Sequence, residues 1–244
     1  MIDCLIDSGN SRVKFAIDQN DQWQYLSAVE FEHPQFVEQC LQILQGHSFS
    51  KIYLANVSKG ERAAQLELFL AQVLLPIHRI NTQAQLGPLI ISYPEPKQLG
   101  VDRFLSLLAA SAEPLPCVII SFGSALTIDV LTADGQHLGG LIAPSPEFQW
   151  RAMQNHFSGL FPEPGTVQEL AQNTADALTS GITLQTIALL ERVIASNNQT
   201  GDTRIFVTGG AAQQWLDKLP SQRIYVPDIV FHGMHRFIAL HSDE

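Results

Sequence analysis

The sequence CLIDSGNSRVKFAI, residues 4–17, places a carboxylate, a glycine turn and a lysine at the end of an apolar strand. The residues before Asp7 have the composition of a buried strand, the next four favour a turn, and apolar residues resume at Val13. A turn at a strand end exposes backbone N–H groups, and glycine allows a phosphate group to approach them closely. The pattern therefore indicates a candidate phosphate-binding hairpin.

Each polar residue of this hairpin suits that chemistry. Gly9, Asn10 and Ser11 would donate hydrogen bonds, Asp7 would hold Mg²⁺ through water, and Lys14 would reach phosphate oxygens. A tight hairpin with a capping aspartate and a solvated lysine explains the same residues without any ligand. For an isolated motif of this kind, the ordinary hairpin is the more common structure.

A second stretch, VIISFGSALTIDVL at residues 118–131, resembles the first, but Ser121 stands where the first has Asp7. Its turn, Gly123-Ser124, would supply further N–H donors, and Asp129 follows on the returning strand. Each half of the chain thus opens with a strand–glycine–strand hairpin and continues with helical sequence. This order favours an internal duplication, and a coincidence of two common hairpins is the alternative.

The remaining periodicity predicts an α/β protein with two domains, residues 1–115 and 116–244. Strands are expected at 2–8, 11–18, 23–29, 51–56, 117–121 and 204–207, and helices at 34–44, 61–75, 104–112, 166–173, 175–195 and 229–241. The last of these strands leads into Thr208-Gly209-Gly210, either an ordinary turn or one against which an adenosine could lie.

Composition excludes several classes of protein. The 244 residues carry 24 acidic and 14 basic side chains, a formal charge of −10, which argues against a nucleic-acid surface. The three cysteines are widely spaced within apolar runs, which is typical of core thiols in a reducing compartment. With no signal peptide and no apolar run of about 18 residues, we expect a soluble cytoplasmic protein that does not enter a membrane.

The loop YPEPKQLGVDR at residues 93–103 ends with a carboxylate beside a guanidinium, just before an apolar helix. As structure, Asp102 would be a good helix N-cap. As chemistry, Asp102 could take a proton from a hydroxyl group while Arg103 binds a carboxylate or phosphate. The sequence alone leaves both readings open.

Other familiar site motifs are missing from the sequence. It contains no Gly-Lys pair and hence no Walker A loop, and neither G-x-G-x-x-G nor G-x-S-x-G occurs. His232 and His235 are three residues apart on a predicted helix without a cysteine or carboxylate cluster beside them in the sequence, a pattern more typical of a helix surface than of a metal site.

Taken together, the motifs resemble the type III pantothenate kinase family over nearly the whole chain. The matching segments are DSGNSRVK at 7–14, YPEPKQLGVDR at 93–103, SFGSALTID at 121–129, GGLIAPS at 139–145, NTADALTSG at 173–181 and TGG at 208–210. The resemblance implies two similar actin-like (ribonuclease H-like) domains with a nucleotide cleft between them. It also implies transfer of the ATP γ-phosphate to the 4′-hydroxyl of pantothenate, the first committed step of coenzyme A synthesis.

The resemblance also assigns site residues. Those implied to bind ATP are Asp7, Ser8, Gly9, Asn10, Ser11, Arg12, Val13, Lys14, Gly123, Ser124, Gly209 and Gly210. Those implied to bind pantothenate are Tyr93, Gly100, Val101, Asp102, Arg103 and Thr174, with Asp102 as the general base. Thr174 corresponds to a contact made across a subunit interface, so the resemblance implies a homodimer.

One position departs from the family pattern. Ser121 stands where the family usually has an aspartate that holds a monovalent cation such as K⁺ or NH₄⁺, and a hydroxyl is a weaker cation ligand than a carboxylate. Three outcomes follow: activity without potassium, compensation by another group such as Asp129, or impaired activity. We favour the first, because the base, the lysine and the substrate loop are all present.

Two other functions are the alternatives to pantothenate phosphorylation. Some relatives of these kinases are described as accessory factors in bacterial transcription regulation, so a non-catalytic regulatory protein is the first alternative. A kinase of the same superfamily that acts on another small hydroxyl or carboxylate substrate is the second. The loop at 93–103 argues against the second, because it matches the pantothenate-binding pattern and not only the fold.

Overall fold

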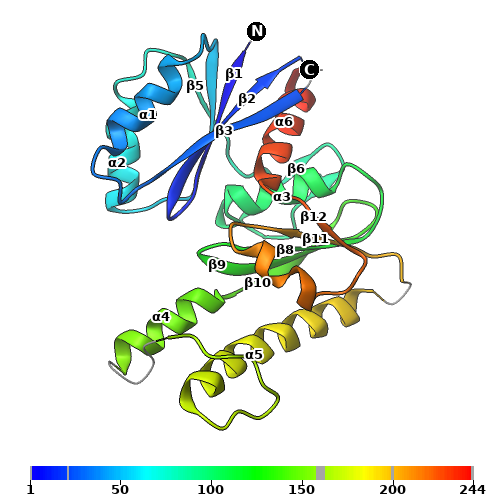
Figure 1. Ribbon diagram of the computed structural model, residues 1–244. Helices are drawn as coiled ribbons and strands as arrows, with labels where there is room; N and C mark the ends of the chain where they lie inside the picture. The colour runs from blue at the N-terminus through cyan, green and yellow to red at the C-terminus, as the bar shows by residue number, and fades with distance from the viewer. Residues whose placement is uncertain (1, 21, 158–162, 199–200, 243–244) are drawn as a thin grey trace. The chain divides into compact units, whose positions relative to one another are not determined.

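The computed structural model describes residues 2–20, 22–157, 163–198 and 201–242 (Figure 1). The chain forms two compact units, which comprise residues 1–114, 134–137 and 228–244, and residues 115–133 and 138–227. These units differ in two places from the predicted domains, residues 1–115 and 116–244. A turn from the second half and the last helix both pack with the first unit.

The first unit is built on a five-stranded mixed sheet. Its order is β3 (Gln22–Glu30), β2 (Arg12–Gln19), β1 (Asp3–Ser8), β4 (Lys51–Asn56) and β5 (Ile77–Arg79). The strand β1 is antiparallel to β2 and parallel to β4, and its register places Asp7 opposite Lys14. The predicted hairpin is therefore present, with both charged residues at its turn end.

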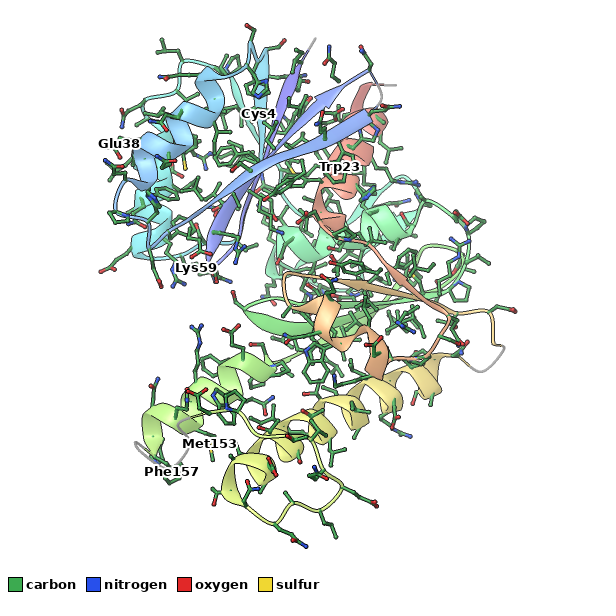
Figure 2. All side chains as sticks on the ribbon, viewed as in Figure 1. Cys4, Trp23, Glu38, Lys59, Met153 and Phe157 are labelled. Carbon is green, nitrogen blue, oxygen red and sulfur yellow. The ribbon has the colours of Figure 1, made fainter. Side chains whose placement is uncertain are left out.

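Helices cover both faces of this sheet (Figure 1). The apolar side chains of one face, among them Ile6 and Phe15, form a core with α1 (Phe36–Gln45) and α2 (Glu61–Leu70). On the other face lie α3 (Val101–Ala110) and α6 (Ile229–Ser242), which also pack extensively against each other. Figure 2 shows Trp23 of β3 on this side, where its ring lies 5.4 Å from that of Phe231 in α6.

The second unit repeats the plan of the first. Its sheet has the order β10 (His137–Pro144), β9 (Ala125–Leu131), β8 (Cys117–Phe122), β11 (Arg204–Thr208) and β12 (Arg223–Tyr225). The hairpin β8–β9 is antiparallel and β11 is parallel to β8, as in the first sheet. The same strand order in both sheets supports the internal duplication indicated by the two hairpin motifs.

One face of the second sheet packs on a long helix, α5 (Thr174–Asn197), and on a 3-10 helix, η2 (Ala212–Lys218). Its core joins Val118 and Ile120 of β8 to Leu190 and Ile194 of α5. A further helix, α4 (Pro146–His156), carries Met153 and is followed by Phe157 (Figure 2). Because Ser145 accepts a hydrogen bond from the Phe148 N–H, α4 begins with a side-chain cap.

Several predicted helix boundaries were wrong. The helix expected at 166–173 is an irregular segment, because its backbone N–H groups bind side chains of α5: Thr166 donates to Asp176 and Gln168 donates to Ser180. The helix expected at 61–75 ends at Leu70. The helix expected at 104–112 runs from Val101 to Ala110, so it begins with the substrate-loop residues.

Three short elements lie between the larger ones of the first unit: the paired strands β6 (Gln85–Leu86) and β7 (Leu89–Ile90), and the 3-10 helix η1 (Pro96–Gln98).

The three cysteines are buried and free, as predicted. Burial raises the pKa of Cys40 and of Cys117 to about 12 and also raises the pKa of Cys4, so these thiols are unreactive core groups.

By length and composition alone, one helix among the described residues, α5, could cross a membrane. This differs from the expectation that no apolar run is long enough. The helix carries Asp176, Glu191 and Arg192, and 28% of its most apolar window is buried. A core or interface helix of a globular protein meets the same criterion, so the finding is weak evidence for a membrane.

Candidate active site

The first unit brings Asp7 and Lys14 together at the turn end of β1 and β2. Burial raises the pKa of Asp7, Lys14 lowers it, and the carboxylates of Asp102 and Asp228 raise it, which together give a pKa of about 7. Two further carboxylates thus act on Asp7, and one ammonium group opposes them. Such a surplus of negative charge favours a cation at this site.

The turn after β1 is fixed at both ends. The Gly9 N–H donates to the Arg12 carbonyl at 3.1 Å, and the Phe31 N–H donates to the Ser11 carbonyl at 3.1 Å. Ser8 is fully buried, and its carbonyl accepts the N–H of Val57 at 3.0 Å. Asn10 and Ser11 are exposed between these anchors. The turn can therefore present its polar groups to a ligand without a change of backbone conformation.

The carboxylate of Asp102 lies in the first turn of α3. Gly100 is the N-cap residue and Asp102 is the second helical residue, so the N-cap reading of Asp102 was wrong. Asp102 Oδ1 accepts the N–H of Arg103 at 2.9 Å, and a β-carbon at position 100 would lie 2.5 Å from that oxygen. A glycine at 100 therefore leaves space for the carboxylate, and the positive end of the helix dipole stabilises its charge.

The guanidinium of Arg103 is buried beside an aromatic ring. The side chain of Arg103 donates to the Tyr93 hydroxyl at 3.4 Å, and its guanidinium carbon lies 6.0 Å from the centre of that ring. Tyr93 also stacks on His137, with the ring centres 5.8 Å apart and an interplanar angle of 19°. The three side chains form one packed group at the start of α3.

Two of these neighbours, His137 and Asp228, were missed by sequence reasoning. His137 is fully buried and follows a turn that the first unit holds tightly: Gly135 has φ +85°, and its carbonyl accepts the Ile90 N–H at 2.9 Å. Asp228 precedes α6 and accepts a hydrogen bond from Lys14. In the sequence, a Pro-Asp pair before a helix signals only a helix start.

In the second unit, the two predicted glycine turns lie side by side. The N–H of Ala211, just after Gly210, donates to the Phe122 carbonyl at 3.1 Å, and Gly123 follows Phe122 directly. Gly209 has φ +98°, and a β-carbon there would lie 2.4 Å from the Phe122 oxygen. Only glycine fits this approach, so the second unit does build a single surface from both turns, with Ser124 exposed on it.

The position of Ser121 is now defined. It lies opposite Thr127 in the β8–β9 ladder, whereas the first hairpin has Asp7 opposite Lys14. Asp129, two residues along the same strand as Thr127, lies on the same face and is buried. Thr174, the remaining predicted substrate residue, is the exposed first residue of α5.

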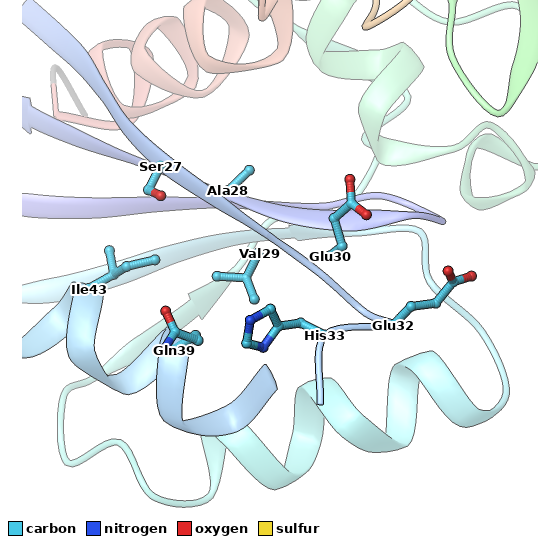
Figure 3. Close-up of a pocket in the computed structure, with 8 residues that line it drawn as sticks. All are labelled: Ser27, Ala28, Val29, Glu30, Glu32, His33, Gln39 and Ile43. Carbon is cyan, nitrogen blue, oxygen red and sulfur yellow. The ribbon is translucent and has the colours of Figure 1, made fainter. Parts of the chain in front are cut away.

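A pocket of about 390 Å³ lies elsewhere in the first unit, between the edge strand β3 and α1 (Figure 3). Val29, His33 and Gln39 converge in it, with Glu30 and Glu32 at its rim. None of the predicted site residues lines this pocket. It adjoins them through the β2–β3 ladder, which pairs Val29 with Val13, and through a largely exposed ion pair between Glu30 and Arg12 at 3.3 Å.

Comparison with known proteins connects this geometry to one family. The family model described as type III pantothenate kinase matches residues 4–196. The chain belongs to the type III pantothenate kinase family. A type III pantothenate kinase of Stenotrophomonas maltophilia strain K279a is 34% identical over 244 residues, which cover 99% of each chain. The one from Thiobacillus denitrificans is 29% identical over 235 residues, 95% of this chain and 94% of its own.

Solved structures agree on the fold. A protein from Campylobacter jejuni, described as a candidate Baf family transcriptional activator, aligns with a TM-score of 0.62 at 21% identity, over 99% of this chain and 100% of its own. A candidate 2-dehydro-3-deoxygalactonokinase from Sinorhizobium meliloti aligns with a TM-score of 0.59 at 13% identity, over 98% of each chain. At these identities the likeness concerns the fold alone. The predicted fold class, two actin-like domains, is confirmed for this member of the type III pantothenate kinase family.

Proposed function

We propose that this chain phosphorylates pantothenate at its 4′-hydroxyl with ATP, the first step of coenzyme A synthesis. One observation carries the proposal: the first unit holds the Asp7–Lys14 pair next to the carboxylate of Asp102, which α3 places beside the buried Arg103. Family membership gives the substrates, and this arrangement gives each of them chemically suitable partners.

The phosphates of ATP are bound at the turn between β1 and β2. Exposed N–H groups of Asn10 and Ser11 and the ammonium of Lys14 would neutralise the phosphate oxygens. The residues from Asp7 to Lys14 are those assigned to the phosphates. The resemblance also assigns Gly123, Ser124, Gly209 and Gly210 to ATP, and the hydrogen bond that joins these two turns in the second unit supports that assignment.

The residue that would hold Mg²⁺ is Asp7. Burial is the main cause of its raised pKa, with the nearby carboxylates of Asp102 and Asp228 adding to it, and a divalent ion would offset both effects. Within the described part of the chain, no group of three or more His, Cys, Asp or Glu side chains could hold a metal ion. The ion would therefore take its other ligands from phosphate oxygens and water, as Mg²⁺ in kinases commonly does.

Pantothenate is a carboxylic acid with a primary hydroxyl group. Arg103, with Tyr93 against it, offers a fixed guanidinium for an anionic group of the substrate. Asp102 would take the proton of the hydroxyl as that oxygen attacks the γ-phosphorus, whose bond to the bridging oxygen breaks so that ADP leaves. Acid–base help of this kind is typically worth about 10²–10⁴ in rate, and positioning and charge neutralisation supply the rest.

We propose further that potassium is not needed. The hydroxyl of Ser121 is a weak cation ligand, and its partner across the ladder, Thr127, is also neutral. The buried carboxylate of Asp129 on the same face is the group that could compensate. These residues fit a cation site poorly, so no step of the proposed reaction depends on K⁺ or NH₄⁺.

The active protein is proposed to be a cytoplasmic homodimer. Large exposed apolar side chains in the second unit are concentrated on β10, α4, the segment before α5 and α5 itself. Those in these segments are Leu138, Leu141, Ile142, Phe148, Phe157, Val167, Leu170 and Leu184, and two more, Ile224 and Tyr225, lie on β12. Thr174 begins α5 beside this set, which suits a residue that reaches the substrate of a partner subunit. Three unreactive buried thiols suit a reducing compartment.

The test is ADP release from ATP and Mg²⁺ on addition of pantothenate, with 4′-phosphopantothenate identified by mass. Asp102→Asn should reduce kcat by about 10²–10⁴ because the general base is lost, with thermal stability little changed. Size-exclusion chromatography with light scattering should give twice the chain mass. Folded protein that releases no ADP with pantothenate would contradict the proposal.

A further inference from the structure

A carboxylate outside the family motifs holds the lysine of the phosphate turn. Lys14 Nζ donates to Asp228 Oδ1 at 2.5 Å, and each of the two side chains is 24% exposed. This residue pair joins β2 to the start of α6, 214 positions apart in the chain. Lys14 is therefore already engaged before any phosphate arrives.

The backbone fixes Asp228 in place. Its φ is +55°, a left-handed conformation that is unfavourable for most non-glycine residues and that Asp and Asn tolerate best. The carbonyl of Asp228 accepts the Phe231 N–H at 2.9 Å, so the residue also begins α6. Phe231 is fully buried against Trp23. The carboxylate is thus aimed at Lys14 by a rigid support.

The charges around this pair set up a competition. Asp228 and Asp102 both act on Asp7, and Lys14 is the cation that offsets them. Tyr25 on β3 lies within the same field: burial raises its pKa, Asp228 also raises it, and Lys14 and Arg12 lower it. A phosphate group that approaches Lys14 meets a carboxylate that already occupies the ammonium, so the two anions compete for one cation.

We propose that Asp228 is a positioning residue that holds the Lys14 ammonium at the phosphate turn and yields it to ATP, and so weakens ATP binding. The inference rests on the proposed role of Lys14 as a phosphate ligand. The ion pair keeps a long, flexible side chain in place in the free protein. Its loss on binding opposes the gain from the phosphate contact, which keeps the nucleotide exchangeable.

The test variant is Asp228→Asn in the full-length chain. Asparagine tolerates the left-handed backbone and keeps the size and one acceptor oxygen, but it removes the charge that competes with phosphate. The Kd of ATP by calorimetry and the KM for ATP should both fall about 3- to 10-fold, the effect of a partly buried ion pair. The KM for pantothenate should not change.

Two controls separate this role from a structural one. Asp18→Asn makes the same change at another carboxylate that contacts α6, where His235 Nδ1 lies 3.1 Å away, and should leave ATP affinity unchanged. Lys14→Gln supplies the second arm of a double-mutant cycle: in that background, Asp228→Asn should have no effect on the Kd of ATP. A structural role would instead lower stability and alter both KM values.

The outcomes are distinct. Tighter ATP binding that depends on Lys14 supports the inference. An unchanged or weaker ATP affinity in Asp228→Asn, or an effect that persists in Lys14→Gln, overturns it. Wild-type protein that binds ATP without turning over pantothenate would contradict the proposed function alone. The double-mutant cycle, measured by the Kd of ATP, would still decide the role of Asp228. Wild-type protein that does not bind ATP would overturn both.

Discussion

Gly233 in α6 lies so close to Leu105 in α3 that a β-carbon on it would sit 2.0 Å from the Leu105 carbonyl oxygen. A contact of that length with backbone cannot relax by a side-chain movement. The helix α3 carries Asp102 and Arg103, and α6 begins at Asp228. The absence of a side chain at position 233 therefore sets the distance between the two helices that carry the candidate active-site residues.

Gly233→Ala should destabilise the first unit by about 1–3 kcal/mol, because overpacking against backbone outweighs the gain of up to about 1 kcal/mol in helix propensity. For a chain of this size that lowers Tm by roughly 2–4 °C for each kcal/mol. Thermal denaturation followed by circular dichroism measures the change.

The matched control is Ala239→Gly, at an exposed position of the same helix. It changes helix propensity in the opposite direction without a new contact, and should cost about 1 kcal/mol. A Gly233→Ala variant as stable as the wild type would show that α6 can move away from α3 at little cost. The spacing of these two helices would then be set by other contacts.

The sequence predicted those parts of the fold whose signal is local. The hairpins around Asp7 and Ser121 follow from apolar runs broken by glycine turns, and their strands lie within a residue or two of the predicted ranges. The expected helix at 166–173 failed because its N–H groups find acceptors on α5, which local propensity does not register.

The missing parts of the site come from distant segments. Asp228 reaches Lys14 only because α6 returns to the first unit after the whole of the second has been formed. His137 reaches Tyr93 because a turn at 134–137 packs against residues 88–90. Neither residue has a neighbour in sequence that marks it, so the pairs follow from topology and not from pattern.

The stack of His137 on Tyr93 should keep Arg103, the residue proposed to bind pantothenate, in position. His137→Ala removes the ring beneath Tyr93 at a fully buried site, so Tyr93 and Arg103 lose their support. We expect the KM for pantothenate to rise about 10-fold with the KM for ATP unchanged, the pattern of lost substrate positioning. His137→Phe keeps a ring of similar size and should stay within about 3-fold of the wild type. Equal effects of both variants would mean that the imidazole acts chemically and not by packing.

The pKa of Asp7, raised from its ordinary value to about 7, makes the stability of the free protein depend on pH. The folded state binds this proton more tightly than the unfolded state does, so its stabilising effect is complete below about pH 4 and is lost as the pH rises through about 7. Asp7→Asn lacks the buried charge. It should therefore be more stable than the wild type at pH 8, by several degrees in Tm, and the gap should narrow as the pH falls towards 4. Thermal melts across this range measure it, and a gap that is independent of pH would place the pKa of Asp7 near its ordinary value.

The neutral pair Ser121–Thr127 leads to a prediction about salt. Wild-type turnover measured with sodium as the only monovalent metal ion should change by less than about 2-fold when potassium is added, because a hydroxyl is a weak cation ligand. Ser121→Asp introduces a carboxylate on the face that also carries the buried Asp129, and should make turnover depend on potassium. Ser121→Asn, which has a similar size and no charge, is the control and should remain insensitive. Strong potassium activation of the wild type would mean that Asp129 and its neighbours rebuild a cation site without the aspartate usual in the family. Asp129→Asn should then abolish that activation.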